Sequence, residues 1–198
     1  MLRTQVLSGI SHVGLALRDP EEFAARWNRG AVDYRLPVWA ALATTAVLGT
    51  MLYGFSMGMF DGAGAMLLKG LKCTTAAGLA WCIPLPALYI LNSLAGSRLP
   101  AGSTLLAALV TVSWGGLAMI ASVPINMFFT ATVPHGGFLL LVNLVVFTGV
   151  GVAMIDVFHR VMARLEPSRA GAPTWWLLLV GAIGAELFYA FGLFAFGS

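Results

Sequence analysis

Long apolar stretches separated by short polar segments make up most of the chain. Each stretch is close to the ~20 residues that a helix needs to cross a hydrocarbon core about 30 Å thick. Charged residues, prolines and tryptophans mark the ends of the stretches, as expected at the level of the lipid headgroups. The pattern predicts five transmembrane helices, at residues 37–60, 74–94, 103–123, 136–156 and 174–197.

Two further segments are apolar but too short to cross a bilayer alone. Residues 61–72 carry Lys69 and Lys72 among leucines, and form either a short interfacial helix or the first turns of a long second span. Residues 125–133 carry no charge. We expect this second segment to lie at the membrane interface.

A helix start precedes the first apolar stretch. The run Asp-Pro-Glu-Glu at residues 19–22 supplies an N-cap, a proline at the first helical position and acid in the first turn. The helix is expected to run to Asn28 and to stop at Gly30, with Phe23 and Trp27 on one face. It is either an amphipathic helix on the cytoplasmic membrane surface or a helix that packs on the loops of the bundle.

Composition places the chain among membrane proteins. Hydrophobic residues make up 59% of it and charged residues only 10%, with a mean hydropathy of +0.88, whereas soluble domains carry about 25% charged residues. A bilayer accommodates this composition because helices satisfy their own backbone polar groups. We therefore predict an all-α membrane bundle, with a cytoplasmic N-terminal segment at residues 1–36 and a five-helix transmembrane domain at residues 37–198.

The basic residues are distributed unevenly between the predicted loops. Nine arginines fall at residues 1–36, 95–102 and 157–173, and only Lys69 and Lys72 fall on the other side. Because positive residues are retained in the cytoplasm, we predict a bacterial inner-membrane protein with a cytoplasmic N-terminus and an external C-terminus. No cleavable signal peptide is apparent. The arginines form no basic stripe, so we expect the lipid bilayer as a partner and no nucleic acid.

Glu186 is the acid that lies deepest in a predicted span. It follows the tryptophan pair by about ten residues, and near mid-bilayer an ionised carboxylate is costly unless it faces the bundle interior or is protonated. Asn143 falls at nearly the same predicted depth, Ser113 is within about a turn of it, and Tyr189 follows on the same helix. This set indicates either a proton, cation or substrate site, or an acid that joins helices or contacts a partner subunit.

Prolines and small residues predict how the helices pack. Pro84 and Pro86 each remove a backbone donor inside the second span, so the helix should kink or break there. Small residues four positions apart let helices approach closely, either within the chain or in an oligomer. These small residues are Gly54, Gly58 and Gly62 in the first span and Gly181 and Ala185 in the fifth.

Patterns for catalysis and metal binding are absent from the sequence. It has no nucleotide-binding glycine motif, no His-Glu-x-x-His and no nucleophile beside a base. His135 and His159 lie at opposite ends of one predicted span and cannot share a haem or a metal. Cys73 and Cys82 fall on opposite faces of a continuous helix, too far apart for a disulfide. We predict no enzymatic activity, no metal and no cofactor.

The layout also carries a family resemblance. An N-terminal cytoplasmic segment, five closely spaced spans and the glycine-bearing turn Leu-Ala-Gly-Ser-Arg at residues 94–98 together resemble the Yip family of small membrane proteins and its bacterial relatives. The resemblance extends over residues 34–198. It implies a non-enzymatic scaffold that organises membrane partners, with no active-site residues to carry over.

Three functional hypotheses follow from these observations. The leading one is a non-enzymatic accessory or scaffolding subunit of a larger inner-membrane assembly, bound to another membrane protein or to a second copy of the chain. The alternative is a small transporter, channel or permease subunit with a mid-membrane polar site around Glu186. The third is an electron-transfer membrane anchor, for which the expected paired intramembrane histidines are absent.

Overall fold

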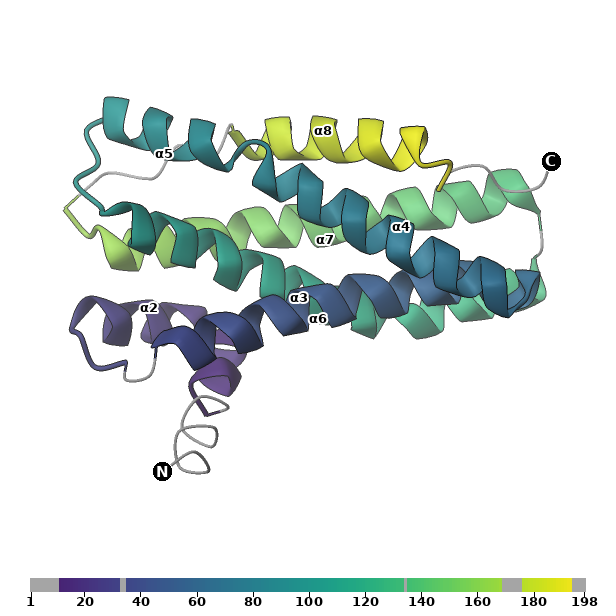
Figure 1. Cartoon of the computed structure of the whole chain (residues 1–198), viewed down its shortest axis with the longest axis horizontal. Helices are drawn as coiled ribbons and strands as arrows, with labels where there is room; N and C mark the ends of the chain where they lie inside the picture. Colours follow the sequence, from purple (N-terminus) through teal and green to yellow (C-terminus); the bar gives the residue numbers. More distant parts are fainter. Residues whose placement is uncertain (1–10, 33–34, 134, 169–175, 194–198) are drawn as a thin grey trace.

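The helices of the chain lie lengthwise in an elongated bundle (Figure 1). A computed structural model describes residues 11–32, 35–133, 135–168 and 176–193, and the regular elements within these ranges are helical. Residues 11–18 form the first described helical turns. The following elements are α2 (Pro20–Asn28), α3 (Arg35–Gly58), the short 3-10 helix η1 (Met59–Asp61), α4 (Ala63–Cys82), α5 (Leu85–Leu94), α6 (Ala101–Thr132), α7 (Gly136–Leu165) and α8 (Trp176–Ala190).

Four stretches of the described residues are long and apolar enough to cross a bilayer. They are Leu36–Asp61, Ala63–Leu94, Ala101–Thr132 and Gly136–Leu165. The prediction of an all-α fold with several membrane-spanning helices is therefore confirmed for this part of the chain. The fifth predicted span corresponds to the shorter apolar helix Leu177–Ala190. Because residues 174–175 and 194–197 lie outside the described residues, the fifth span stays a prediction.

Residues 61–72 were expected to form either a short interfacial helix or the first turns of a long second span. Helix α4 begins at Ala63 and continues without a break to Cys82, so this segment forms the first turns of a long span. A separate interfacial helix is excluded. Gly62, with φ +97°, makes the turn that lets α4 reverse direction after η1, a conformation that side chains other than glycine rarely adopt.

The third span is longer than the sequence predicted. Residues 125–132 do not form a separate segment but are the last turns of the 32-residue helix α6, which runs through Pro124. A proline removes only one donor and kinks a helix more often than it ends one when packing holds both halves. Here Asn126 Nδ2 donates to Ser56 Oγ at 2.8 Å, and this bond ties the segment beyond the proline to α3.

The N-terminal segment packs into the bundle. Helix α2 has the predicted bounds, its N-cap Asp19 accepts a hydrogen bond from the backbone N–H of Glu22, and the chain turns at Gly30 with φ +70°. Phe23 and Trp27 are buried in one apolar cluster with residues of α3, α6 and α7. The structure therefore covers the apolar face of α2 with protein.

The two ends of the bundle differ in charge. At one end, the carboxylate of Glu21 pairs with Arg160 at 3.4 Å and with Arg164 at 3.2 Å, and Glu166 accepts a bond from the backbone N–H of Arg98 at 2.9 Å. At the other end Lys69 pairs with Asp61 at 2.7 Å. We call these the arginine end and the lysine end. Arg98, Arg160 and Arg164, which the sequence analysis assigned to one side of the membrane, lie together at the arginine end.

Candidate functional site

A buried polar network joins three helices. The Tyr53 hydroxyl of α3 donates to Asn143 Oδ1 of α7 at 2.9 Å. Asn143 Nδ2 donates to Leu139 O at 2.8 Å and to Asn126 Oδ1 of α6 at 3.4 Å. Asn126 Nδ2 in turn donates to Ser56 Oγ, whose own proton goes to Tyr53 O at 2.6 Å.

This network is closed on itself. Tyr53, Ser56, Asn126 and Asn143 each expose 1% of their surface or less, and their donors point at one another or at backbone carbonyls. A buried network with every member satisfied rigidifies a core and specifies one arrangement of it. The arrangement fixes the register of α3, α6 and α7, and it leaves no donor or acceptor of Asn143 directed at a ligand.

Glu186 lies elsewhere, on the outside of the bundle. Its side chain is exposed and makes no hydrogen bond or ion pair within the described residues. The partners of Asn143 come from α3, α6 and α7, whereas Glu186 belongs to α8. The expectation that Glu186 faces the interior beside Asn143 is therefore wrong. A period of 3.6 residues does not reveal which face of an almost uniformly apolar helix turns inward.

The alignment of α8 against α4 shows how far along the bundle Glu186 lies. A Cβ built on Gly184 would lie 3.6 Å from Ala80 Cβ, and Lys72 Nζ donates to Phe191 O at 2.7 Å. The two helices therefore run antiparallel, with Glu186 level with Gly78, the midpoint of the stretch Ala63–Leu94. The position of Glu186 relative to the bilayer stays a prediction, whereas its predicted inward orientation is not the one observed.

The remaining members of the predicted polar set are also separate. Ser113 is buried in α6 and its Oγ lies 2.7 Å from both Leu42 O of α3 and Leu109 O. Ser113 therefore joins α6 to α3 at a separate point, because the Asn143 network reaches α6 at Asn126. Tyr189 is 76% exposed on α8, on the same outer side of that helix as Glu186.

Prolines end α4 where the sequence predicted a kink or break. Pro84 is the N-cap of α5 and Pro86 lies in its first turn, and α5 leaves the line of α4 along the upper edge of the bundle (Figure 1). Asn92 is buried within α5. The neighbouring described residues place no charged side chain at this break, which acts as a change of helix direction.

Glycines of the first span form the closest helix contacts. A Cβ on Gly54 would lie 2.7 Å from Gly70 Cα, and one on Gly58 would lie 2.8 Å from Ala65 O. Gly62 instead forms a turn. A contact that the sequence analysis missed is closer still, because a Cβ on Gly49 would lie 2.1 Å from Gly116 O of α6. Gly49 and Gly116 lie outside the four-residue rows of small residues, so the spacing rule did not identify this contact.

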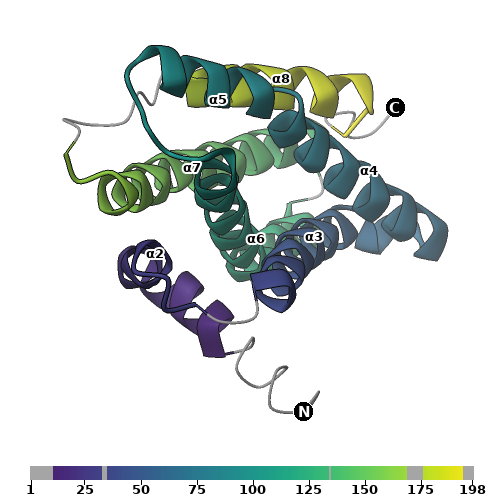
Figure 2. The same ribbon diagram turned by 60° about the vertical axis from the view of Figure 1, so that its left-hand side comes forward.

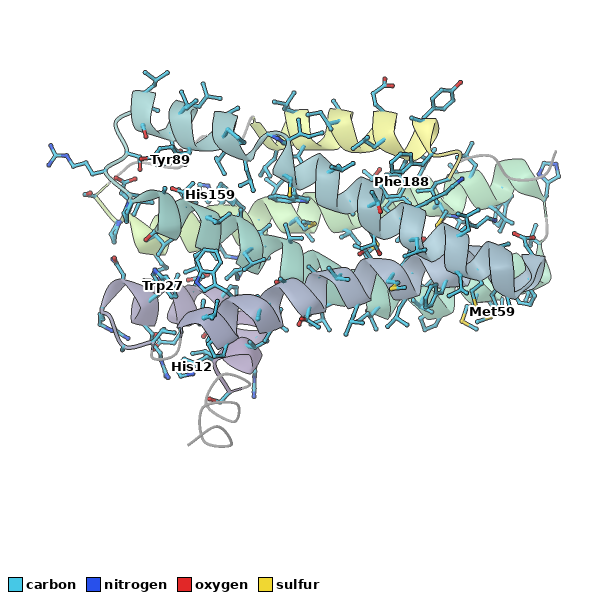
Figure 3. The ribbon with its side chains drawn as sticks, viewed as in Figure 1. His12, Trp27, Met59, Tyr89, His159 and Phe188 are labelled. Atoms are coloured by element: carbon cyan, nitrogen blue, oxygen red, sulfur yellow. The ribbon has the colours of Figure 1, made fainter. Side chains whose placement is uncertain are left out.

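Small residues of α8 make no comparable contact. A Cβ on Gly181 would meet nothing within 4 Å, and Ala185 is exposed. Both residues instead line a cavity of about 490 Å³ between α4, α6, α7 and α8. Figure 2 shows α8 beside α4 and α5 at the edge of the bundle, and Phe188 lies on its bundle side (Figure 3).

The described residues contain neither a cluster of metal-ligating side chains nor a cysteine pair. Within them no group of three His, Cys, Asp or Glu side chains is close enough to hold a metal ion. Cys73 is buried and Cys82 is exposed, both as free thiols.

Comparison with known proteins returned no match, either to a family model, to a curated protein or to a solved structure. The Yip resemblance accordingly stays a prediction.

Proposed function

We propose that this protein is a non-enzymatic accessory or scaffolding subunit of a bacterial inner-membrane assembly, and that the outer face of α8 receives a transmembrane helix of a different protein. The observation that carries the proposal is Glu186, an exposed carboxyl level with the middle of the second span. A carboxyl facing lipid at that depth is costly, and it is stabilised when a neighbouring helix supplies a donor or a positive charge.

A second copy of the chain would not bring a basic side chain to that depth. The described arginine side chains that form ion pairs form them at the arginine end, while Lys69 and Lys72 already bond to Asp61 and to the carbonyl of Phe191. Two copies meeting at α8 would bring carboxyl against carboxyl. We therefore assign the partner as a different membrane protein that presents a basic side chain near mid-bilayer.

The inner-membrane location and the orientation belong to the same proposal. Arginines gathered at one end of the bundle support placing that end in the cytoplasm, because positive loops resist translocation. The N-terminus is then cytoplasmic. With α8 as a fifth span, the C-terminus is external.

Photocrosslinking in native membranes tests the partner. A benzoylphenylalanine at Ala182, on the outer face of α8, should crosslink a membrane protein, and Glu186→Leu should abolish the product. The same probe at Val145, which is 63% exposed on α7, is the control and should give no such product. A monomer in mild detergent with no protein crosslinked from residue 182 would overturn the proposal.

A further inference from the structure

The strongest unassigned feature is the cavity of about 490 Å³ beside α8. Its size falls in the range of about 300–1,000 Å³ that is typical of small-molecule sites. Its lining is almost wholly aliphatic, aromatic or glycine. The hydroxyl of Thr50 at its wall is already bonded to Ala46 O at 3.0 Å. An apolar cavity of this kind selects an apolar occupant over water.

The cavity opens sideways between two helices. Thr148 and Val152 of α7 and Gly181 and Ala185 of α8 line it and are themselves exposed. Both pairs are four residues apart, so each forms one edge of the mouth. In a membrane-spanning bundle this mouth faces the hydrocarbon of the bilayer.

The lining of the cavity extends along the helices and ends at aromatic rings on one side. Along α8 its lining runs from Leu177 to Phe188, which corresponds to ~16 Å of helix. The Phe188 ring meets Phe147 at 4.5 Å, and Phe147 meets Tyr53 at 5.4 Å. These rings bound the cavity toward the lysine end. Toward the arginine end the lining reaches Trp81 and the start of α8.

We infer that the cavity binds one acyl chain of a membrane phospholipid from the leaflet at the arginine end, with the chain entering between α7 and α8 and its methyl end against Phe147 and Phe188. The surrounding medium supplies this ligand at high concentration. A linear hydrocarbon fits a cavity whose lining follows the helix axes and contains, besides apolar residues and glycines, only Thr50, Thr148 and Cys73.

Photocrosslinking to labelled phospholipids tests the inference. The purified full-length protein is reconstituted into vesicles of phosphatidylethanolamine and phosphatidylglycerol that carry a diazirine near the middle of one acyl chain. After irradiation, crosslinked peptides are mapped by mass spectrometry. We expect adducts concentrated on cavity-lining residues of α7 and α8, above the level on exposed residues of α3 and α4.

Two glycines permit filling without a clash, because a Cβ on Gly151 or on Gly181 would meet no atom within 4 Å. Gly151→Leu and Gly181→Leu should each lower the affinity of the cavity for an acyl chain by about tenfold, the factor for displacing two methylenes from an apolar site, and should thereby reduce the cavity adducts. Gly149→Leu is the matched control, because Gly149 also has open space and does not line the cavity. It should leave the adducts unchanged.

Circular dichroism and a single gel-filtration peak establish that each variant is folded. Uniform labelling of lipid-facing residues, or cavity adducts that persist in both filled variants, would overturn the inference. A native-membrane crosslink from the cavity to a protein side chain instead of a lipid would also overturn it. The partner proposal depends on residues 182 and 186 and can fail independently.

Discussion

The Tyr53 hydroxyl donates to Asn143 Oδ1 at 2.9 Å, although 90 positions of sequence separate the two residues. The bond joins the first span to the fourth, and both side chains are buried. Tyr53→Phe should lower the free energy of unfolding in detergent by about 0.6–1.7 kcal/mol, the range for hydrogen bonds between membrane helices. Thermal unfolding followed by circular dichroism measures it.

Tyr89→Phe is the control for this change, because Tyr89 is 41% exposed on α5. It should unfold like the parent. Equal stability of Tyr53→Phe and the parent would show that the network does not hold the helices together. Asn143→Ala should cost more, about 1–3 kcal/mol, because it strips partners from both Tyr53 and Asn126.

Gly49 governs the closest approach of α3 and α6. Gly49→Ala would place a methyl group 2.1 Å from Gly116 O, a backbone atom that cannot rotate away. The helices must separate, so we expect a loss of at least about 1–3 kcal/mol, as for overpacked cores. Gly78→Ala, at a helical site with open space, should be neutral or slightly stabilising. A Gly49→Ala protein as stable as Gly78→Ala would contradict this packing.

These residues show where sequence reasoning succeeded and where it failed. The N-cap at Asp19 and the turn at Gly30 depend on neighbours within a few positions, so local patterns identified them. The network of Tyr53, Asn126 and Asn143 depends on how three helices align, which no local pattern encodes. The prediction that Asn143 lies at the depth of Glu186 assumed a fourth span at residues 136–156. Helix α7 instead extends to Leu165, so Asn143 lies well before its midpoint.

Lys72 stabilises the end of α8. Its ammonium donates to Phe191 O at 2.7 Å, where the last carbonyls of the helix lack partners and the helix dipole favours a positive charge. Lys72→Met keeps the apolar stem and removes the bond. We expect faster amide hydrogen exchange in the last turn of α8 and unchanged exchange in α7. Equal exchange in Lys72→Met and the parent would show that the contact does not secure this end.

The carboxyl of Glu22 reports on whether helix α2 is folded. The hydrogen bond from Arg26, at 2.9 Å, lowers the pKa of its carboxyl below the ordinary value of 4.5, with Arg29 adding to the effect. Because the folded pKa is depressed, the stabilisation is present above the unfolded pKa and is lost as pH falls through the folded one. Arg26→Met should raise the Glu22 pKa, as read from its carboxyl carbon resonance by NMR. An unchanged pKa would mean that the pair does not form.

The orientation of the bundle is testable from its two ends. In a Cys82→Ser background, which leaves only the buried Cys73, a cysteine introduced at Ser97 belongs to the arginine end and one introduced at Gly64, an exposed site with open space near the start of α4, belongs to the lysine end. Because nine arginines lie in the segments assigned to one side and positive segments stay in the cytoplasm, a membrane-impermeant maleimide added to intact spheroplasts should label residue 64 and not residue 97. Lysis should expose residue 97. Labelling of residue 97 in intact spheroplasts would invert the topology and place the acyl-chain cavity in contact with the opposite leaflet.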